Sequence, residues 1–224
     1  SIVQLDNGGI TSLADELQRE HLAGTFDGLV LVAEGDTVIF KSAYGYADRK
    51  SYVINTPVTV SDMGSIAKTF TAAAVLQLAQ NERLQLSDTI GDFYPTASDE
   101  VKPITIMQLL GHTSGLDNFH NDSDFELMDK AQAESRILAM PLIAKPGEKI
   151  AYSNAAYTLL AAIVEKASDQ PFQDYVQDNL LTPLNLSKTG FYEDTRISIR
   201  SIARGYGGDD HGSTTFEKGL TWAL

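Results

Sequence analysis

The chain has 224 residues, 43% of them apolar, and a net charge of -13 from 30 acidic and 17 basic residues. That length and apolar content are enough for one large domain or two small ones with a real core. A surface this acidic repels nucleic acid and anionic membranes, so we exclude nucleic acid as a partner. Because the sequence has no cysteine, it has no disulfides, thiol catalysis or thiolate metal sites. No apolar run approaches the length of a transmembrane helix.

The first part of the chain mixes a helix with strands. Ser12 is a capping residue type, and we expect it to begin a helix over residues 13–22. Residues 29–33 and 38–46 read as strands, and residues 34–37 between them have the composition of a hairpin turn. We therefore predict an antiparallel pair of strands after the first helix.

From residue 66 to about residue 184 the pattern is mostly helical. The expected helices cover residues 66–80, 104–110, 125–140, 153–167 and 172–180. The seven prolines fall at or near the boundaries between these elements. This pattern suits a helical subdomain inserted after the opening strands of an antiparallel sheet.

Ser65 and Lys68 form the first candidate site. Residues three apart on a helix lie on the same face, so the amine is within reach of the hydroxyl and can activate it as a nucleophile. Ser65 also falls at the N-terminus of the expected helix, where backbone N–H groups and the helix dipole favour developing negative charge. The alternative is a capping serine followed by a surface lysine.

Tyr152, Ser153 and Asn154 form the second candidate site, where the helix over residues 153–167 begins. A phenol can exchange a proton with a serine oxygen when a nearby ammonium lowers its pKa. The amide of Asn154 can hold either a lysine or a substrate carbonyl. The alternative is a helix cap in which Tyr152 is a half-buried core aromatic.

These two sites belong to a set of six segments that follow one another in a recognisable order. The segments are residues 26–33, 44–48, 63–70, 109–116, 145–148 with 152–154, and 181–186. Together they resemble the penicillin-recognising serine hydrolases, in the branch of class C β-lactamases, Tyr-x-Asn D-alanyl-D-alanine carboxypeptidases and β-lactamase-like esterases. The resemblance implies an α/β (α+β) fold, with an antiparallel sheet flanked by helices and an inserted all-helical subdomain.

Three regions follow from this resemblance. Residues 1–60 would form the N-terminal part of the sheet domain. Residues 61–190 would form the mostly helical subdomain that carries both candidate sites, and residues 191–224 would begin the return to the sheet domain. The catalytic groups would lie in the cleft between the two lobes.

The same resemblance assigns roles to the candidate residues. Ser65 would be the acylated nucleophile, Lys68 and Tyr152 would share the general-base work, and Asn154 would contact the substrate. The sequence leaves open which of Lys68 and Tyr152 takes the proton. Stabilising the oxyanion requires two donors, one of them the backbone N–H of Ser65. This chemistry needs no metal, and we expect no metal and no cofactor.

The family's third motif, a Lys-Thr-Gly or His-x-Gly triplet on a strand, has no convincing match. Lys188, Thr189 and Gly190 have the right letters, but they follow the segment at residues 181–186, where family members carry a turn without a catalytic role. We therefore expect the chain to lack its closing sheet strands. Pairing with a missing C-terminal segment or with a second chain would then complete the sheet.

Two other segments could hold a site. His112 lies in the landmark segment at residues 109–116, and we expect a structural role for it, a hydrogen bond that fixes the loop. The acidic stretch at residues 117–126 has oxygen ligands but lacks the glycine and the glutamate spacing of a calcium loop. We expect a solvated loop there, with Phe119 or Phe125 near the substrate.

The sequence thus predicts a serine hydrolase that cleaves an ester, amide or peptide bond through an acyl-enzyme on Ser65. It favours an esterase or D-peptidase over a dedicated β-lactamase, and the substrate would be a small molecule or peptide. The alternatives are a catalytically impaired penicillin-binding or sensor protein and an incomplete fragment that needs a partner segment. Because the family is frequently exported, we expect a periplasmic or secreted location, with the cytoplasm as the alternative.

Overall fold

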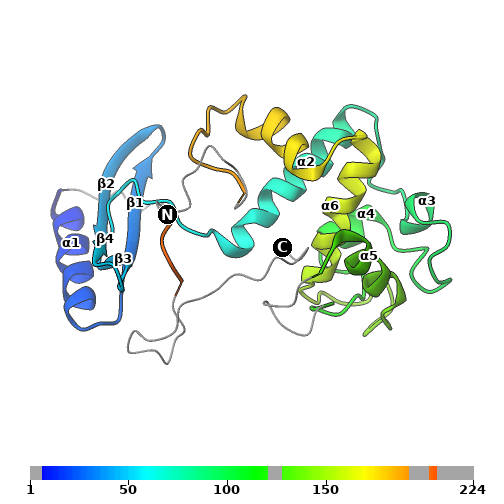
Figure 1. Cartoon of the computed structure of the whole chain (residues 1–224), viewed down its shortest axis with the longest axis horizontal. Coiled ribbons are helices and arrows are strands. Elements are labelled where there is room, and N and C mark those ends of the chain that lie inside the picture. Colours follow the sequence, from blue (N-terminus) through cyan, green and yellow to red (C-terminus); the bar gives the residue numbers. More distant parts are fainter. Residues whose placement is uncertain (1–6, 121–127, 192–201, 206–224) are drawn as a thin grey trace. The chain divides into compact units, whose positions relative to one another are not determined.

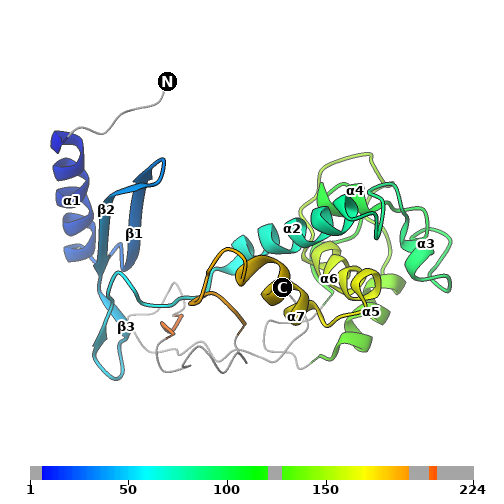
Figure 2. The same cartoon turned by 90° about the horizontal axis from the view of Figure 1, so that it is seen from above.

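The computed structural model describes residues 7–120, 128–191 and 202–205 (Figures 1 and 2). These residues form two compact units. The first contains residues 7–62 and 202–205, and the second contains residues 63–120 and 128–191.

In the first unit a helix packs on an antiparallel pair of strands. Helix α1 (Asn7–Leu22) lies beside strands β1 (Gly28–Glu34) and β2 (Thr37–Tyr44) in both views (Figures 1 and 2). The two strands pair along their whole length, from Gly28 opposite Tyr44 to Glu34 opposite Thr37. The predicted hairpin is therefore confirmed.

The predicted start of the first helix was wrong. The helix begins at Asn7 rather than at residue 13, and Ser12 is an exposed residue inside it. The reason is that the partly buried stripe starts earlier than the capping signal suggested. Its members Ile10, Leu13 and Leu17 recur at helical spacing on one face.

The second strand was also predicted too long, because it ends at Tyr44 and not at residue 46. Gly45 follows with φ +71°, and a Cβ there would lie 2.1 Å from the Asp27 carboxylate, so the chain turns at this glycine. A further pair of short antiparallel strands then forms, β3 (Tyr46–Asp48) and β4 (Val53–Ile54), which the sequence did not indicate.

Residues 202–204 pair with the same unit, although they follow β4 by well over a hundred positions in the chain. Ile202 forms a parallel bridge with Val60. Arg204 donates its backbone N–H to the Ala47 carbonyl at 2.8 Å, and its Nε lies 3.1 Å from the Asp48 carboxylate. These contacts connect late residues to the opening strands.

The named elements of the second unit are all helical within the residues that the structure describes. A 3₁₀ turn (Gly64–Ile66) leads into α2 (Ala67–Gln80). The helices that follow are α3 (Ile90–Phe93), α4 (Ile106–Leu110), α5 (Lys130–Ala139), α6 (Asn154–Ser168) and α7 (Phe172–Val176), which continues as a π turn (Gln177–Leu181). Antiparallel strands in one unit and helices in the other give the predicted α+β architecture.

Helix α6 forms the centre of this unit. It packs against α2, α4, α5 and α7, and it lies next to α2 in both views (Figures 1 and 2). Its residues 155–164 are all buried, so the helix is enclosed on every face. Alanines at four of these positions allow neighbouring helices to approach closely. The position of residue 154, where α6 begins, is therefore fixed by a packed core.

Side-chain caps explain where the structure departs from the predicted helix ends. Thr105 caps α4, so that helix begins at Ile106 rather than at residue 104. Asp129 caps α5, which begins at Lys130. Both caps are capping boxes, with a Gln three residues on that returns a bond to the backbone. The predicted start at Phe125 lies outside the described residues. At α7, the predicted helix gives way to the π turn after Val176.

We expect Gly115→Ala to be strongly destabilising. Gly115 has φ +79°, and a Cβ there would lie 2.1 Å from the carbonyl oxygen of Ala144. Gly24 is a matched control, because its φ is +75° and no atom lies within 4 Å of a Cβ built on it. Gly24→Ala should lower the free energy of unfolding by about 1 kcal/mol, the strain of left-handed backbone. For Gly115→Ala, a further ~2 kcal/mol should come from the steric clash.

Urea denaturation of the two variants beside the parent protein measures both losses. Equal losses would mean that the chain around Ala144 relaxes without cost, contrary to this expectation.

Candidate active site

Ser65 and Lys68 lie on one face where α2 begins. Gly64, with φ +51°, starts the 3₁₀ turn that contains Ser65, and Lys68 occupies the first turn of α2. The Lys68 Nζ donates a hydrogen bond to the Ser65 Oγ over 3.4 Å. Ser65 is exposed and caps neither the 3₁₀ turn nor α2, whereas only 7% of Lys68 is exposed. The reading as a capping serine with a surface lysine is therefore wrong.

Tyr152 contacts Ser65 although the two residues are 87 positions apart in the chain. Its phenol oxygen lies 2.7 Å from the Ser65 Oγ. The tyrosine is 46% exposed, so it is not a core aromatic. The Lys68 Nζ lies 5.2 Å from the centre of the Tyr152 ring. Both the phenol and the ammonium thus adjoin one serine hydroxyl.

Asn154, the first residue of α6, connects Lys68 to a second asparagine. Its Oδ1 accepts a hydrogen bond from the Lys68 Nζ at 2.6 Å, and its Nδ2 donates to the Asn118 Oδ1 at 2.9 Å. The sequence allowed this amide to hold either a lysine or a substrate carbonyl, and in the structure it binds Lys68.

Sequence reasoning missed Asn118. Its backbone carbonyl accepts from the N–H groups of Asn154 and Ala155 at 2.9 and 3.0 Å, and its side chain holds the Asn154 amide. Asn118 lies in the stretch that we predicted to be a solvated loop. No local pattern indicates its partner, because the two asparagines are 36 positions apart.

His112 contacts the segment at residues 151–153, which leads into α6. Its Nδ1 accepts a hydrogen bond from the Ser153 N–H at 3.1 Å, and its carbonyl accepts from the Ala151 N–H at 2.8 Å. Its ring stacks on the Tyr152 ring with centroids 4.5 Å apart, and lies 5.0 Å from that of Tyr157. The backbone of His112 has φ +55°.

The surroundings of Tyr152 and His112 shift the pKa values of both side chains. Burial raises the pKa of Tyr152, but hydrogen bonds with Lys68 and Ser65 and the positive charge of Lys68 outweigh it and hold this pKa below its usual value. Burial lowers the pKa of His112, and the Lys68 charge lowers it further. The phenol is therefore easier to ionise than usual, and the imidazole harder to protonate.

The remaining sequence candidates lie outside this cluster. Lys188, Thr189 and Gly190 lie in a turn and irregular chain after the π turn rather than in a strand, as predicted. Phe119 is 54% exposed and directly follows Asn118, while Phe125 lies outside the described residues. In the part of the chain that the structure describes, no three His, Asp or Glu side chains gather as metal ligands. No described helix is long and apolar enough to cross a membrane.

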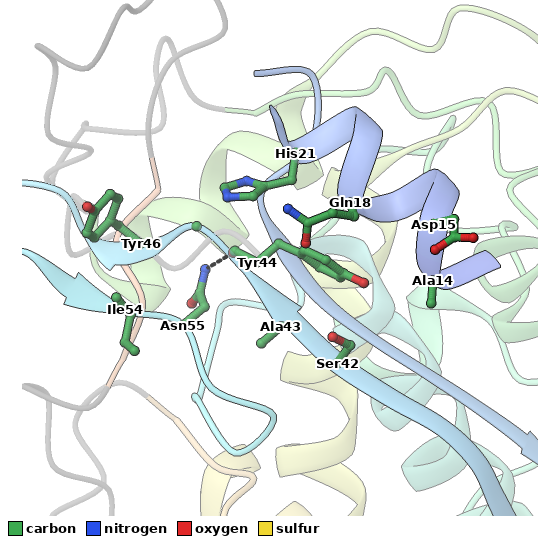
Figure 3. A pocket seen from close by; sticks show the side chains of 11 residues that line it. Ala14, Asp15, Gln18, His21, Ser42, Ala43, Tyr44, Tyr46, Ile54 and Asn55 are labelled. Carbon is green, nitrogen blue, oxygen red and sulfur yellow. Dashed lines mark hydrogen bonds between the residues drawn. The ribbon is translucent and has the colours of Figure 1, made fainter. Parts of the chain in front are cut away.

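A pocket of about 630 Å³ lies elsewhere, within the first unit (Figure 3). Helix α1 contributes Gln18 and His21, and the strands contribute Ser42 and Tyr44. Asn55 also lines it and donates a hydrogen bond to the Tyr44 carbonyl (Figure 3). None of the predicted site residues lines this pocket. We therefore place the candidate site at the Ser65 cluster, where a phenol and an ammonium meet one hydroxyl, rather than at this pocket.

The fold is of the β-lactamase and transpeptidase type. The chain belongs to the beta-lactamase family, whose family model matches residues 13–221.

Curated relatives and solved structures are similar to much of the chain. Protein flp of Staphylococcus aureus (strain COL) is 32% identical over 203 residues, which cover 88% of this chain and 40% of the relative. The putative penicillin-binding protein PbpX of Bacillus subtilis is 30% identical over 168 residues, 75% of this chain and 42% of the relative. The chain thus spans about two fifths of the length of these relatives.

Among solved structures, the octameric penicillin-binding protein homologue from Pyrococcus abyssi matches with a TM-score of 0.76 and 25% identity. That match covers 96% of this chain and 50% of the other.

The shift in the Tyr152 pKa gives a direct test of this electrostatic arrangement. Replacing Lys68 by Met removes both its charge and its hydrogen bonding while leaving the burial, so the pKa of Tyr152 should rise. The absorbance of the phenolate, followed against pH as the difference between each protein and its Tyr152→Phe counterpart, isolates this one tyrosine. Lys102→Met serves as the control, because Lys102 pairs with Asp99 in a different part of the unit. A Tyr152 titration that is the same with and without Lys68 would contradict the assignment.

Proposed function

We propose that this protein is a serine hydrolase that cleaves an ester, amide or peptide bond through an acyl-enzyme on Ser65. The observation that carries the proposal is the convergence on one exposed hydroxyl of a phenol at 2.7 Å and an ammonium at 3.4 Å. A serine hydroxyl is a weak nucleophile on its own, and an adjacent base is the usual way to activate it.

Tyr152 is the group that we assign as general base. It is closer to the Ser65 Oγ than Lys68 is, and its pKa is held below the usual value, so its phenolate is accessible at lower pH. A base whose pKa lies nearer the working pH transfers protons more effectively. Lys68 then acts by its positive charge, which stabilises the phenolate.

Asn154 has two functions in this proposal. Its oxygen holds the Lys68 ammonium in place, and one N–H of its amide binds Asn118. An asparagine amide carries a second N–H donor, and we assign that donor to the substrate carbonyl. In this way the residue would both position Lys68 and contact the substrate.

The reaction follows from these assignments. The Ser65 Oγ attacks the carbonyl as its proton moves to Tyr152, and the proton then passes to the leaving oxygen or nitrogen. Water attacks the acyl-enzyme as its own proton moves to Tyr152, and the proton then returns to Ser65. The backbone N–H of Ser65 is one oxyanion donor. We propose that the second comes from a further segment that completes the site, in the same chain or in a second one.

The substrate class is a small ester, amide or peptide. The names of two relatives, a putative penicillin-binding protein and a penicillin-binding protein homologue, support the use of a penicillin as a probe of the site. We propose an esterase or D-peptidase rather than a dedicated β-lactamase, in a periplasmic or secreted location. Fractionation of the source cells would decide the location.

Intact-mass measurement before and after incubation with a labelled penicillin and, in parallel, a fluorophosphonate tests the proposal. We expect a single adduct that maps to Ser65 and is absent in Ser65→Ala. The rate at which the penicillin adduct is lost separates a hydrolase from a covalent sensor. A folded protein that forms no adduct with either reagent would refute the assigned nucleophile.

Tyr152→Phe removes the proposed base while keeping the ring. Acylation of Ser65 should slow by about 10²–10⁴-fold, the usual contribution of such a group. The matched control is Tyr46→Phe, an exposed tyrosine on strand β3 of the first unit. Acylation rates by stopped-flow fluorescence give the comparison, and an unchanged rate would remove Tyr152 from the mechanism.

A further inference from the structure

We propose that His112 is a positioning residue that holds Tyr152 against Ser65, and that it does so only as the neutral imidazole. This inference rests on the proposed function, because it concerns the group assigned there as general base. His112, which lies outside the reacting atoms, would then account for part of the pH dependence of Ser65 acylation.

Two contacts constrain Tyr152 from the same imidazole. The ring of His112 stacks on the phenol ring with centroids 4.5 Å apart and planes 30° apart. Its Nδ1 accepts the N–H of Ser153, the residue directly after Tyr152, at 3.1 Å. One contact limits the orientation of the ring, and the other fixes the backbone beside it. Tyr152 is 46% exposed, so these two contacts, together with those to Lys68 and Ser65, hold the phenol 2.7 Å from the Ser65 Oγ.

The hydrogen bond to Ser153 requires an unprotonated Nδ1. A backbone N–H can only donate, so a proton on Nδ1 would place two donors face to face and break the bond. The titratable groups that face the imidazole are Lys68 of α2, Tyr152 just before α6, and Tyr157 in the first turn of α6. Burial and the Lys68 charge keep the pKa of His112 below its ordinary value. The bond is therefore present at neutral pH and is lost as the pH falls through this lowered pKa.

Asparagine is a well-matched replacement at this position. Its Oδ1 is as many bonds from the Cα as the Nδ1 of histidine, so it can accept the same N–H, and asparagine tolerates the left-handed φ of +55°. It has neither a ring to stack nor a proton to gain. His112→Ala, in contrast, also removes the acceptor. His21→Asn, in the first unit and paired with Asp27, is the control for the substitution itself.

The experiment measures the rate of Ser65 acylation by a fluorophosphonate from mildly acidic to neutral pH in all four proteins. At neutral pH we expect His112→Asn to be roughly tenfold slower than the parent, the fold-change of one lost aromatic stacking contact. His112→Ala, which also loses the hydrogen bond to Ser153, should be slower still. The parent and His21→Asn should lose activity through the titration of His112. In His112→Asn that part of the acidic fall should be absent. Parental rates and an unchanged pH profile in His112→Asn would overturn the proposal.

Nuclear magnetic resonance gives a second readout that does not depend on activity. In the parent protein, the nitrogen shifts of His112 should report a proton on Nε2 and none on Nδ1 at neutral pH. The Ser153 amide and Tyr152 ring signals should shift with the titration of His112. If the parent protein is never acylated, the proposed function fails, yet these coupled shifts still support the positioning contact. A His112 titration that leaves both signals unmoved overturns it.

Discussion

The arrangement of the site depends on a buried positive charge. The Lys68 ammonium lies in the first turn of α2 with little contact with solvent, and burying a charge is costly unless polar groups replace the lost water. The Asn154 oxygen at 2.6 Å does this most closely, and a hydrogen bond to a charged group contributes about 1.5–3 kcal/mol. Because Asn154 begins the buried helix α6, the charge is tied to the core of the unit. The distance between Lys68 and Ser65 is therefore set by helix packing rather than by a flexible side chain alone.

The loop at residues 112–118 also positions Tyr152, the second group that contacts Ser65. Asn118 holds the amide of Asn154, while His112 holds the backbone after Tyr152. Gly115, between them, lies so close to Ala144 that no side chain fits, which keeps the loop against the chain that precedes Tyr152. One loop thus fixes both the residue that holds the lysine and the residue beside the phenol. The Tyr152 phenol and the Lys68 ammonium therefore keep a fixed position relative to each other, because a single segment positions both.

The residues that could be predicted from the sequence are those whose geometry is local or carried by a motif. Ser65 and Lys68 follow from helical periodicity, and Tyr152 and Asn154 follow from a recognisable segment. Asn118 could not be found, since its role is created by a contact 36 positions away. The start of α1 was misplaced because a capping residue type at Ser12 was given more weight than the apolar stripe. The short strands β3 and β4 were missed because they depend on a turn at Gly45 that the close approach of Asp27 imposes.

The choice of an amide as the partner of Lys68 has a chemical consequence. An aspartate at position 154 would hold the ammonium equally well, but its negative charge would cancel the field of the lysine at short range. Asn154 accepts the hydrogen bond of the Lys68 ammonium without neutralising its positive charge. That charge lowers the pKa of Tyr152 against the opposing influence of burial. A neutral partner for a buried lysine is thus what lets the lysine act on the phenol. The same charge lowers the pKa of His112, so it also keeps neutral the imidazole that stacks on that phenol.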